Sequence, residues 1–396
     1  MKKFQNRWDW PRWGTLVLAY LLTVPLCAAA GIFLVDSVEY VTVLRGRYPE
    51  LLYALPCVGL AIAGGYRLCK IPLLATLRFI VNRHNRIYYV SSWIAPLVYG
   101  TTVLSHAAGA SVGCEGSSFL VGASLGSKIS RTLRVNHRDV RPIICCGMAS
   151  AFAPLLGTPL TAAAMILEMT PSRRIRYIIP CLGAAWCAYG LSLWTHVVPM
   201  RYTLYTVSTL GDVAWLKLGV LSFLFLAVGD GFRRLLLGFF HEIPRWIPLP
   251  YVRIFLAGVL FVVLIETTGG LDYCGTGRGV IHEALSGNAR PEAFLWKMGL
   301  TILCLGSGYK GGQIVPAFFI GATLGCTAGN LLGLDPCLTA AMGFVGVFCG
   351  VVRCPLASLF LALEIFGPEA FFCFVPMAGI YFGVSLGGKN FFRKFF

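Results

Sequence analysis

Apolar stretches occupy most of the chain, and short polar or basic segments separate them. Eight stretches are long and uniform enough to predict helices that span a membrane, at residues 13–35, 51–64, 93–109, 177–198, 214–228, 254–265, 294–305 and 371–386. Six others are short or are interrupted by Gly and Pro, at residues 117–129, 143–156, 160–169, 316–332, 338–352 and 356–366. The pattern predicts an all-α polytopic membrane protein.

The short stretches carry further information. A helix needs about 20 residues to cross roughly 30 Å of hydrocarbon, so many of these pieces cannot cross alone. Backbone that breaks at membrane depth is tolerated only where it is buried in protein or lines a water-filled cavity. The interruptions therefore indicate a pathway for a solute.

Composition supports this interpretation. Of the 396 residues, 57% are hydrophobic and 13% are charged, and the mean hydropathy is +0.73. A soluble domain carries about 25% charged residues, so a water-facing surface is excluded, as is a disordered chain. The net charge is 33 − 17 = +16, and the basic residues gather near both ends and in loops, at 2–12, 128–141, 173–176 and 389–394. By the positive-inside rule we expect both termini in the cytoplasm, and we expect no nucleic-acid partner.

No motif indicates a cofactor. The fifteen cysteines are odd in number, lie mostly inside apolar stretches and show no CxxC or His/Cys metal spacing. Buried free cysteine acts as a small hydrophobic side chain. We therefore expect neither a metal nor another cofactor.

An internal repeat divides the chain. Gly122-Ala-Ser-Leu-Gly126 recurs as Gly321-Ala-Thr-Leu-Gly325. An ordered set of six residues then recurs at an offset of 196, namely Gly147, Phe152, Pro159, Leu160, Leu167 and Glu168, with the mates Gly343, Phe348, Pro355, Leu356, Leu363 and Glu364. Two similar halves with broken helices in corresponding places are typical of transporters built from repeats, with the site near the midplane. We place the halves at about 13–200 and 212–396.

Each half opens its repeated helix with a Gly-rich stretch, at 113–118 and at 311–316. Free N–H groups at a helix start, with the positive end of the helix dipole behind them, suit an anion. Pro316 is expected at the first helical position. Two such starts facing one point would bind an anion without a full positive charge, and therefore without holding it too tightly for release.

Glu115 lies within the first of these starts. An acidic residue in an apolar membrane region is by default a functional hypothesis. Its carboxylate can occupy the anion site when it is ionised and leave it when it is protonated. We therefore expect Glu115 to act as a gate.

These residues resemble the signatures of the CLC family of anion channels and proton-coupled antiporters. Gly113-Cys-Glu-Gly116 is similar to the family pattern G-[KR]-E-G-P, and Gly312-Gln-Ile-Val-Pro316 to G-x-F-x-P. Cys69-Lys-Ile-Pro72 weakly resembles G-S-G-I-P, and the C-terminal Gly387-Gly-Lys389 with its following aromatics resembles the last helix of the family. Within the family, the segment 308–325 and Ser117 look most like the bacterial fluoride/proton antiporter branch.

The resemblance implies two inverted-topology repeats with broken helices that meet at a midplane anion site, in one transmembrane domain over residues 1–396. It further implies a homodimer in a bacterial inner membrane, without the family's cytoplasmic regulatory domain. The function implied is not enzymatic: it is fluoride export coupled to proton antiport, with Glu115 as gate and proton acceptor. The residues expected along the anion pathway are Cys69, Lys70, Gly113, Gly116, Ser117, Gly312, Gln313, Ile314, Val315 and Phe392.

The chain departs from the family pattern at several of these places. Cys114 replaces a basic residue, and Gln313 stands where the fluoride branch has a glutamate. Met169 occupies the internal proton-transfer position. Because neither Gln nor Met titrates, a passive chloride or fluoride channel of the same fold is the alternative function.

Other substitutions affect the anion pathway. Cys69 and Phe392 replace the central serine and the pathway tyrosine, which weakens side-chain hydrogen bonding to an anion. Lys70 either attracts anions to the inner mouth or extends to the cytoplasmic interface. Glu168 and its repeat mate Glu364 are expected to pair or cap, with ion passage as the other possibility.

A function of another class is an intramembrane aspartyl protease, for which Asp230 and Asp272 would supply the two acids. Their neighbouring residues do not match the Tyr-Asp and Gly-x-Gly-Asp pair that such enzymes carry. This alternative is the more remote one.

Overall fold

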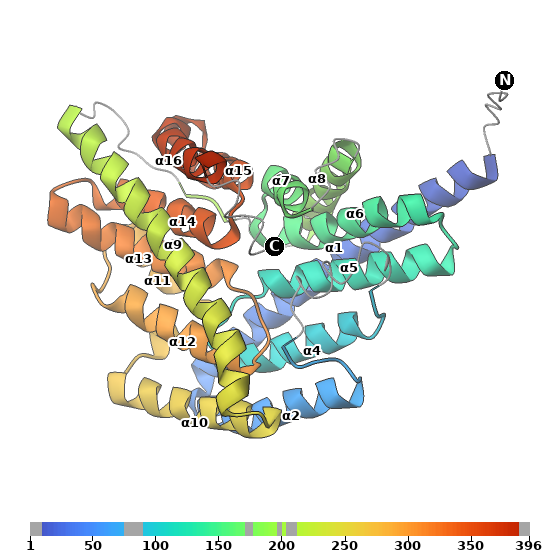
Figure 1. Cartoon of the computed structure of the whole chain (residues 1–396), viewed down its shortest axis with the longest axis horizontal. Coiled ribbons are helices and arrows are strands. Elements are labelled where there is room, and N and C mark those ends of the chain that lie inside the picture. The colour runs from blue at the N-terminus through green and yellow to red at the C-terminus, as the bar shows by residue number, and fades with distance from the viewer. Residues whose placement is uncertain (1–9, 75–89, 171–176, 196–199, 203–211, 388–396) are drawn as a thin grey trace.

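The computed structural model describes residues 10–74, 90–170, 177–195, 200–202 and 212–387, and its regular elements there are helices (Figure 1). The first half contains α1 (Trp10–Arg47), α2 (Leu55–Leu68), α4 (Ile94–Ala107), α5 (Glu115–Thr132), α6 (His137–Leu156), α7 (Pro159–Met169) and α8 (Ile178–Trp194). The second half contains α9 (Asp212–Trp246), α10 (Pro250–Thr268), α11 (Arg278–Leu285), α12 (Ala293–Ser307), α13 (Ile314–Leu332), α14 (Pro336–Val352), α15 (Pro355–Phe366) and α16 (Pro368–Gly387). Short 3-10 helices cover Pro49–Ala54 and Leu271–Tyr273.

Each of the fourteen apolar stretches coincides with a helix over the residues that the structure describes, and the all-α prediction is confirmed. Two differences concern length. Helix α9 continues 18 residues past Val228, because the charges that end the apolar pattern are paired within the protein. Helix α11 was missed because it has only eight residues, of which Ile281, Ala284 and Leu285 are buried.

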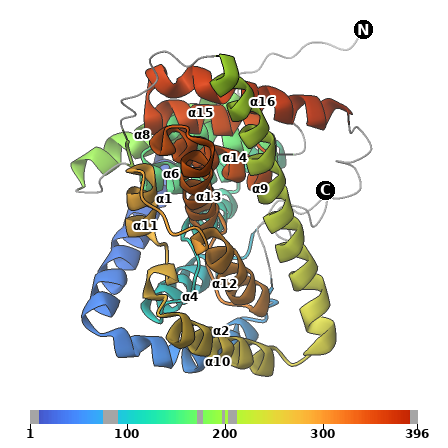
Figure 2. The same cartoon turned by 90° about the vertical axis from the view of Figure 1, so that its left-hand side faces the viewer.

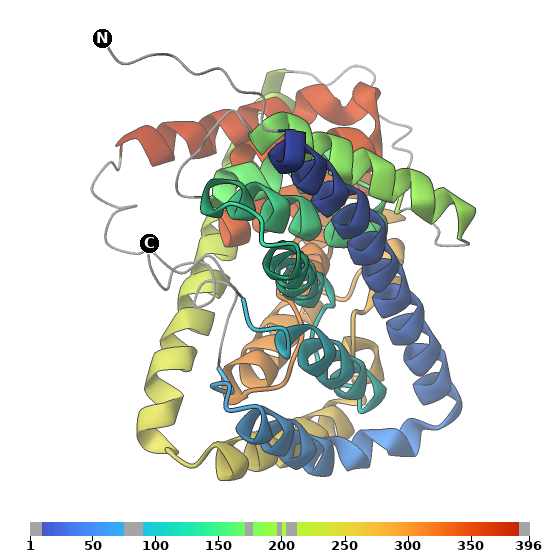
Figure 3. The same cartoon turned by 90° about the vertical axis from the view of Figure 1, so that its right-hand side faces the viewer.

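The two halves have the same internal packing. In each, the long first helix contacts the repeated Gly-rich helix pair, so that α1 and α5 pack on α6, and α9 and α13 pack on α14. The long helices α1 and α9 lie on opposite sides of the molecule (Figures 2 and 3). At one end α2 packs on α10, and at the other α7 packs on α15, so each end is closed by one helix from each half.

The repeated glycines lie where the helices of each pair cross. A Cβ atom on Gly122 would meet the carbonyl of Gly147, and one on Gly343 would meet the carbonyl of Gly321. Small residues at such crossings let membrane helices approach until their backbones touch. The repeat in the sequence therefore corresponds to two equivalent close helix crossings, α5 with α6 and α13 with α14.

Several helices have the length and surface of membrane spans. Among the described residues, six helical segments are long and apolar enough to cross a membrane. Large apolar side chains such as Leu21, Phe33 and Leu216 are exposed on α1 and α9, where lipid would cover them. By contrast, the apolar windows of α6 and α13 are each 83% buried, so these two helices form the protein interior. The chain is an integral membrane protein.

Asp230 and Asp272, the two acids of the remote protease alternative, do not form a pair. Asp230 binds Arg353, the residue that follows α14, and it also binds Arg234 at 2.5 Å and Arg233 at 3.2 Å. Arg353 has a positive φ of 57° at the end of α14, and its ion pair with Asp230 stabilises that turn. Asp272 is instead exposed and lies 3.8 Å from Arg290. Each acid is therefore engaged by arginine and not by the other acid.

The close crossings give a stability prediction. Gly343→Ala inserts a methyl group against the backbone of α13, and we expect it to lower the free energy of unfolding by about 1–3 kcal/mol. Gly219→Ala in α9 is the matched control, because an added Cβ atom would meet no neighbouring helix within 4 Å and alanine favours a helix. Thermal denaturation of both variants in mild detergent measures the difference. Equal midpoints would contradict a backbone-to-backbone crossing.

Candidate functional site

The two Gly-rich helix starts meet in the middle of the fold. Gly113, before α5, donates its N–H to the carbonyl of Gly312 at 2.8 Å, and Gly312, before α13, donates back at 2.5 Å. This antiparallel bridge joins the halves directly. It brings together six of the expected pathway residues, namely Gly113, Gly116, Gly312, Gln313, Ile314 and Val315.

Side chains would not fit at this bridge. A Cβ atom on Gly312 would lie 2.6 Å from the nitrogen of Gly116, and one on Gly113 would meet Oε2 of Glu115. Glycine is therefore needed for the close approach of the two backbones. Because the backbones approach, the free N–H groups of both helix starts lie around one point.

Helix α13 begins two residues earlier than expected. Its first residue is Ile314, so Pro316 is the third helical residue and not the first, which corrects the expectation from the sequence. Proline still lies in the first turn, where its missing N–H costs nothing. The N–H groups at the start of α13 belong to Ile314 and Val315.

The carboxylate of Glu115 occupies this point. Its side chain is fully buried, and Oε1 accepts a hydrogen bond from Sγ of Cys114 at 3.6 Å. Within the described part of the chain, Oε2 has no hydrogen-bond partner. A Cβ atom on Gly113 would meet both Oε2 of Glu115 and the side chain of Val315, so the carboxylate lies between the two helix starts.

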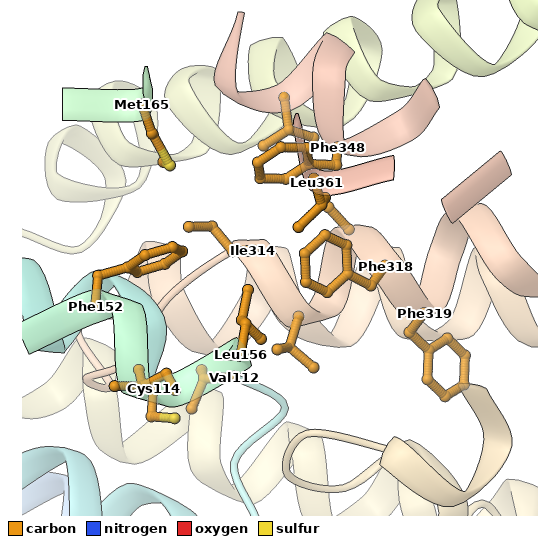
Figure 4. Packing of buried hydrophobic residues seen from close by; sticks show 14 of the residues in the cluster. Val112, Cys114, Phe152, Leu156, Met165, Ile314, Phe318, Phe319, Phe348 and Leu361 are labelled. Carbon is orange, nitrogen blue, oxygen red and sulfur yellow. The ribbon is translucent and has the colours of Figure 1, made fainter. Parts of the chain in front are cut away.

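Apolar side chains from both halves surround the helix starts (Figure 4). Val112, Cys114 and Phe152 come from the first half, and Ile314 and Phe318 come from the second. Phe152 stacks on Phe119 with 4.5 Å between the ring centroids. Such a wall excludes water and strengthens the electrostatic effect of the N–H groups.

A pair of hydroxyl groups joins α4 to the first turn of α5, just after Glu115. Ser117 and Thr102 share a hydrogen bond of 2.7 Å, and both are buried. The carbonyl of Thr102 is 2.8 Å from Nδ1 of His106, which is also fully buried. Ser117 is therefore close to the site, and its hydroxyl is already partnered.

Several basic side chains are buried or partly buried, and their hydrogen-bond partners are backbone carbonyls. Lys297 donates to Tyr273 at 2.9 Å and to Gly275 at 2.6 Å, and Lys310 donates to Leu73. Arg45 and Arg253 donate to the carbonyls of His106 and Ser307. The ion pairs found among the described residues involve other basic groups. These four basic side chains are therefore bound by carbonyl oxygens and not by acids.

The loop after α2 is connected to the Glu115 region only in part. Cys69 caps the end of α2, and Lys70 is exposed with a φ of 54°. Lys310, three residues before Gln313, donates to Leu73 and lies 4.2 Å from the ring centroid of Tyr66. No contact joins Cys69 or Lys70 to Glu115 among the described residues. Phe392 and the match to the last family helix beyond Gly387 lie outside the described residues.

Glu168 and Glu364 cap helices of the opposite half. Glu168 accepts the N–H groups of Leu356 and Ala357 at 3.1 and 2.9 Å, at the start of α15. Glu364 accepts those of Leu160 and Thr161 at 2.7 and 2.9 Å, at the start of α7. It also accepts the Thr161 hydroxyl at 2.7 Å. The arrangement is the reciprocal capping that the sequence favours for these repeat mates.

The two substitutions by residues that do not titrate, Met169 and Gln313, lie at different places in the fold. Met169 ends α7 and packs, partly buried, against the core. Gln313 precedes α13 as its N-cap and makes no side-chain capping bond. Neither provides an acid near Glu115.

Sequence reasoning missed several of these groups. Lys297 lies within the apolar stretch 294–305, where a charge by itself indicates a special environment. The sequence therefore contained a signal for Lys297. The placements of Arg45, Arg253 and Lys310 depend on carbonyls from distant segments, which no local pattern reveals.

The family model described as voltage gated chloride channel matches residues 74–385. The chain belongs to this family, the CLC family. A chloride/fluoride channel protein of Pseudomonas syringae pv. tomato is 33% identical over 92% of this chain and 82% of its own length. The H(+)/Cl(−) exchange transporter ClcA of Salmonella paratyphi B is 26% identical over 71% of this chain and 64% of its own length.

Solved structures agree. A CLC-type fluoride/proton antiporter superposes with a TM-score of 0.89 at 26% identity, and the match covers 96% of this chain and 97% of that one. A slow cyanobacterial Cl−/H+ antiporter superposes with a TM-score of 0.78 at 19% identity, over 95% of both chains, and supports the fold. The CLC fold is therefore shown, and CLC-type anion transport across the membrane is the class of activity of this chain.

The caps can be tested apart from transport. Glu364→Ala removes three hydrogen bonds and Glu168→Ala removes two, so we expect losses of roughly 2 and 1 kcal/mol in unfolding free energy, with anion flux retained. Glu242→Ala, which removes an exposed ion pair, is the control and should change stability by less than about 0.5 kcal/mol. Lost flux at unchanged stability would instead assign the two acids to ion passage.

Proposed function

We propose that this protein exports fluoride in exchange for protons, and that Glu115 is both the gate and the proton acceptor. The observation that carries the proposal is the buried carboxylate of Glu115 at the meeting point of the helix starts of α5 and α13. A carboxylate and a halide ion have the same charge and use the same N–H donors. They therefore compete for one place.

The competition gives a mechanism for exchange. When ionised, the carboxylate fills the place and excludes the anion. After protonation its attraction to the positive helix ends is lost, so it leaves and an anion takes the N–H groups of Ile314 and Val315. Return of Glu115 to the site expels the anion and releases the proton to the opposite side. Anion and proton then move in opposite directions.

The surrounding charges suit this cycle. The cations of Arg45, Arg253, Lys297 and Lys310 are occupied by carbonyls, so they raise the potential without contacting the anion directly. A long-range positive potential attracts an anion, whereas a direct lysine or arginine contact would slow its release. The anion would therefore be bound by backbone dipoles and not by a charged side chain.

Fluoride is proposed on the basis of similarity and chemistry. The relatives whose names include fluoride match nearly the whole chain. Fluoride is small and strongly hydrated, so it needs several N–H donors at short range. The first N–H groups of α5 and α13, which the bridge between Gly113 and Gly312 brings together, would supply them. Gly113, Gly116, Ser117, Gly312 and Gln313 would form the walls of this place.

The inner half of the pathway is proposed from the loop positions. Cys69 and Lys70 would lie along the route to the cytoplasm, with Phe392 from the last segment. Lys70 is exposed, which fits a side chain that reaches the interface. With Met169 and Gln313 unable to titrate, water would carry the proton between Glu115 and the cytoplasm.

A passive anion channel is the second candidate. The same two substitutions favour it, because they remove the titrating groups expected on the inner proton route. The name of the Pseudomonas syringae relative also describes a channel protein. Proton movement separates the two functions.

We propose that both termini are cytoplasmic in a bacterial inner membrane, that the chain forms one transmembrane domain of the two repeats, and that it assembles as a homodimer. Helix α1 then runs outward, so that Arg45 near its end lies on the external side. Arg45 donates to the carbonyl of His106, a residue of the segment that leads to Glu115. The gate would therefore face the outside.

Glu115→Gln tests the proposed role. The amide imitates the protonated acid, so we expect fluoride flux to persist while proton movement falls to that of protein-free liposomes. Glu266→Gln is the matched control, because Glu266 is exposed on α10 and binds Tyr53. Parallel fluoride-electrode and pH recordings from proteoliposomes measure both flows. Unchanged proton movement in Glu115→Gln would remove Glu115 from this role.

A further inference from the structure

A segment of the second half, residues 273–278, lies against both helix starts. Gly275 donates its N–H to the carbonyls of Ala110 and Gly109 at 3.2 and 3.3 Å, in the loop that leads to Glu115. The ring of Tyr273 contacts Phe319 of α13 edge to face, with 6.2 Å between centroids. We call residues 273–278 the bridging segment.

Buried cations hold the bridging segment in place. Lys297 donates to its carbonyls at Tyr273 and Gly275, and the ammonium lies 5.1 Å from the ring centroid of Phe319. The guanidinium of Arg45 lies against Gly275, where a Cβ atom would come within 2.9 Å of Nη1. The segment is therefore fixed from α1 and from α12.

The bridging segment ends at a basic residue, Arg278. Gly277 has a φ of 70°, and the chain then enters α11 with Arg278 as its first residue. A Cβ atom on Gly277 would lie 2.6 Å from the Phe319 ring, so the turn is pressed against α13. Figure 2 shows α11 beside α13, and the two helices are in contact.

The side chain of Arg278 lacks a full set of partners. Its Nε atom is buried and makes no hydrogen bond within the described part of the chain. No carboxylate among the described residues is in salt-bridge contact with it, and the nearby acid Asp272 lies close to Arg290 instead. Helix α11, which begins at Arg278, packs on α13, and Gly275 in the segment before it bonds the loop that leads to Glu115, so Arg278 lies beside the elements that carry the gate.

We propose that Arg278 is the external anion-attracting residue of this protein, and that it replaces from the second half the charge that is missing at Cys114 in the first. Position 114 adjoins the gate and is basic in the sequence pattern that the chain otherwise follows. Here it is a buried neutral thiol. The bridging segment brings a guanidinium to the same mouth from α11.

This arrangement has a physical consequence. A cation at the mouth raises the local concentration of anions and their rate of arrival, and salt screens the effect. Such a cation does not itself bind the anion at the N–H groups, so it leaves the maximal rate of anion transport unchanged. Arg278 is thus a positioning charge for capture, and Lys297 is a positioning residue for the segment that carries it.

The inference rests on the proposed place of the anion site and extends it to capture from outside. The test is the external fluoride dependence of uptake into proteoliposomes. For Arg278→Gln we expect the half-saturating fluoride concentration to rise about tenfold, at unchanged maximal flux, as for one unit charge lost at roughly 12 Å in an effective dielectric of about 20. Added impermeant salt should shrink the difference from wild type.

Three further variants sharpen the test. Arg290→Gln removes an equally positive, exposed arginine and should leave the half-saturating concentration unchanged. Arg278→Lys keeps the charge and should stay within about threefold of wild type. Cys114→Arg combined with Arg278→Gln restores a charge at the gate and should recover the wild-type value. A purely structural role for Arg278 would not be repaired from position 114.

Three results would contradict the proposed role of Arg278. Wild-type half-saturation in Arg278→Gln, or a rise in Arg278→Lys as large as in Arg278→Gln, would overturn the proposal. So would a double variant that folds and remains as weak as Arg278→Gln. Because the readout is anion flux alone, the titration can be repeated with chloride if fluoride or proton coupling fails, so the two proposals fail separately.

Discussion

The rest of the structure depends on one constraint: two helices begin in the interior of a membrane protein, and their first N–H groups have no partner within their own helices. The reciprocal hydrogen bonds between Gly113 and Gly312 bring these starts together at 2.5 and 2.8 Å. Neither water nor lipid can satisfy such groups at that depth without a pathway. An anion or a carboxylate can. The need for glycine at the bridge, the close crossings behind it and the apolar wall in front of it all follow from keeping these N–H groups near one another.

The electrostatics are divided between near and far groups. At the site the positive charge is partial and comes from backbone dipoles, which an anion can leave. Basic side chains lie behind the helix starts, on Arg45, Lys297 and Lys310, and each is held by carbonyl oxygens. Lys297 also fixes the bridging segment through the carbonyls of Tyr273 and Gly275. The basic groups and the backbone around Glu115 therefore depend on one another.

The sequence was sufficient for the helices, because long apolar stretches report lipid and interior faces directly. It was sufficient also for the meeting of the two starts, because the repeat made Gly113 and Gly312 equivalent in role. It could not place Arg278, since α11 is short and its first residue has meaning only through contacts of the bridging segment with Ala110 and Phe319. It misjudged Pro316 because local rules favour proline at the first position, while the bridge made α13 begin two residues earlier. Roles along the inner route remain proposals that depend on Cys69, Lys70 and Phe392.

The most direct test of fluoride/proton exchange uses the unaltered protein in liposomes loaded with fluoride or with chloride, with the membrane voltage clamped by potassium and valinomycin and the external pH recorded. The account predicts that fluoride leaves faster than chloride, and that its efflux draws protons inward so that the external solution becomes alkaline. Fluoride efflux at a constant external pH would contradict exchange and establish a channel. Faster efflux of chloride than of fluoride would contradict the proposed substrate.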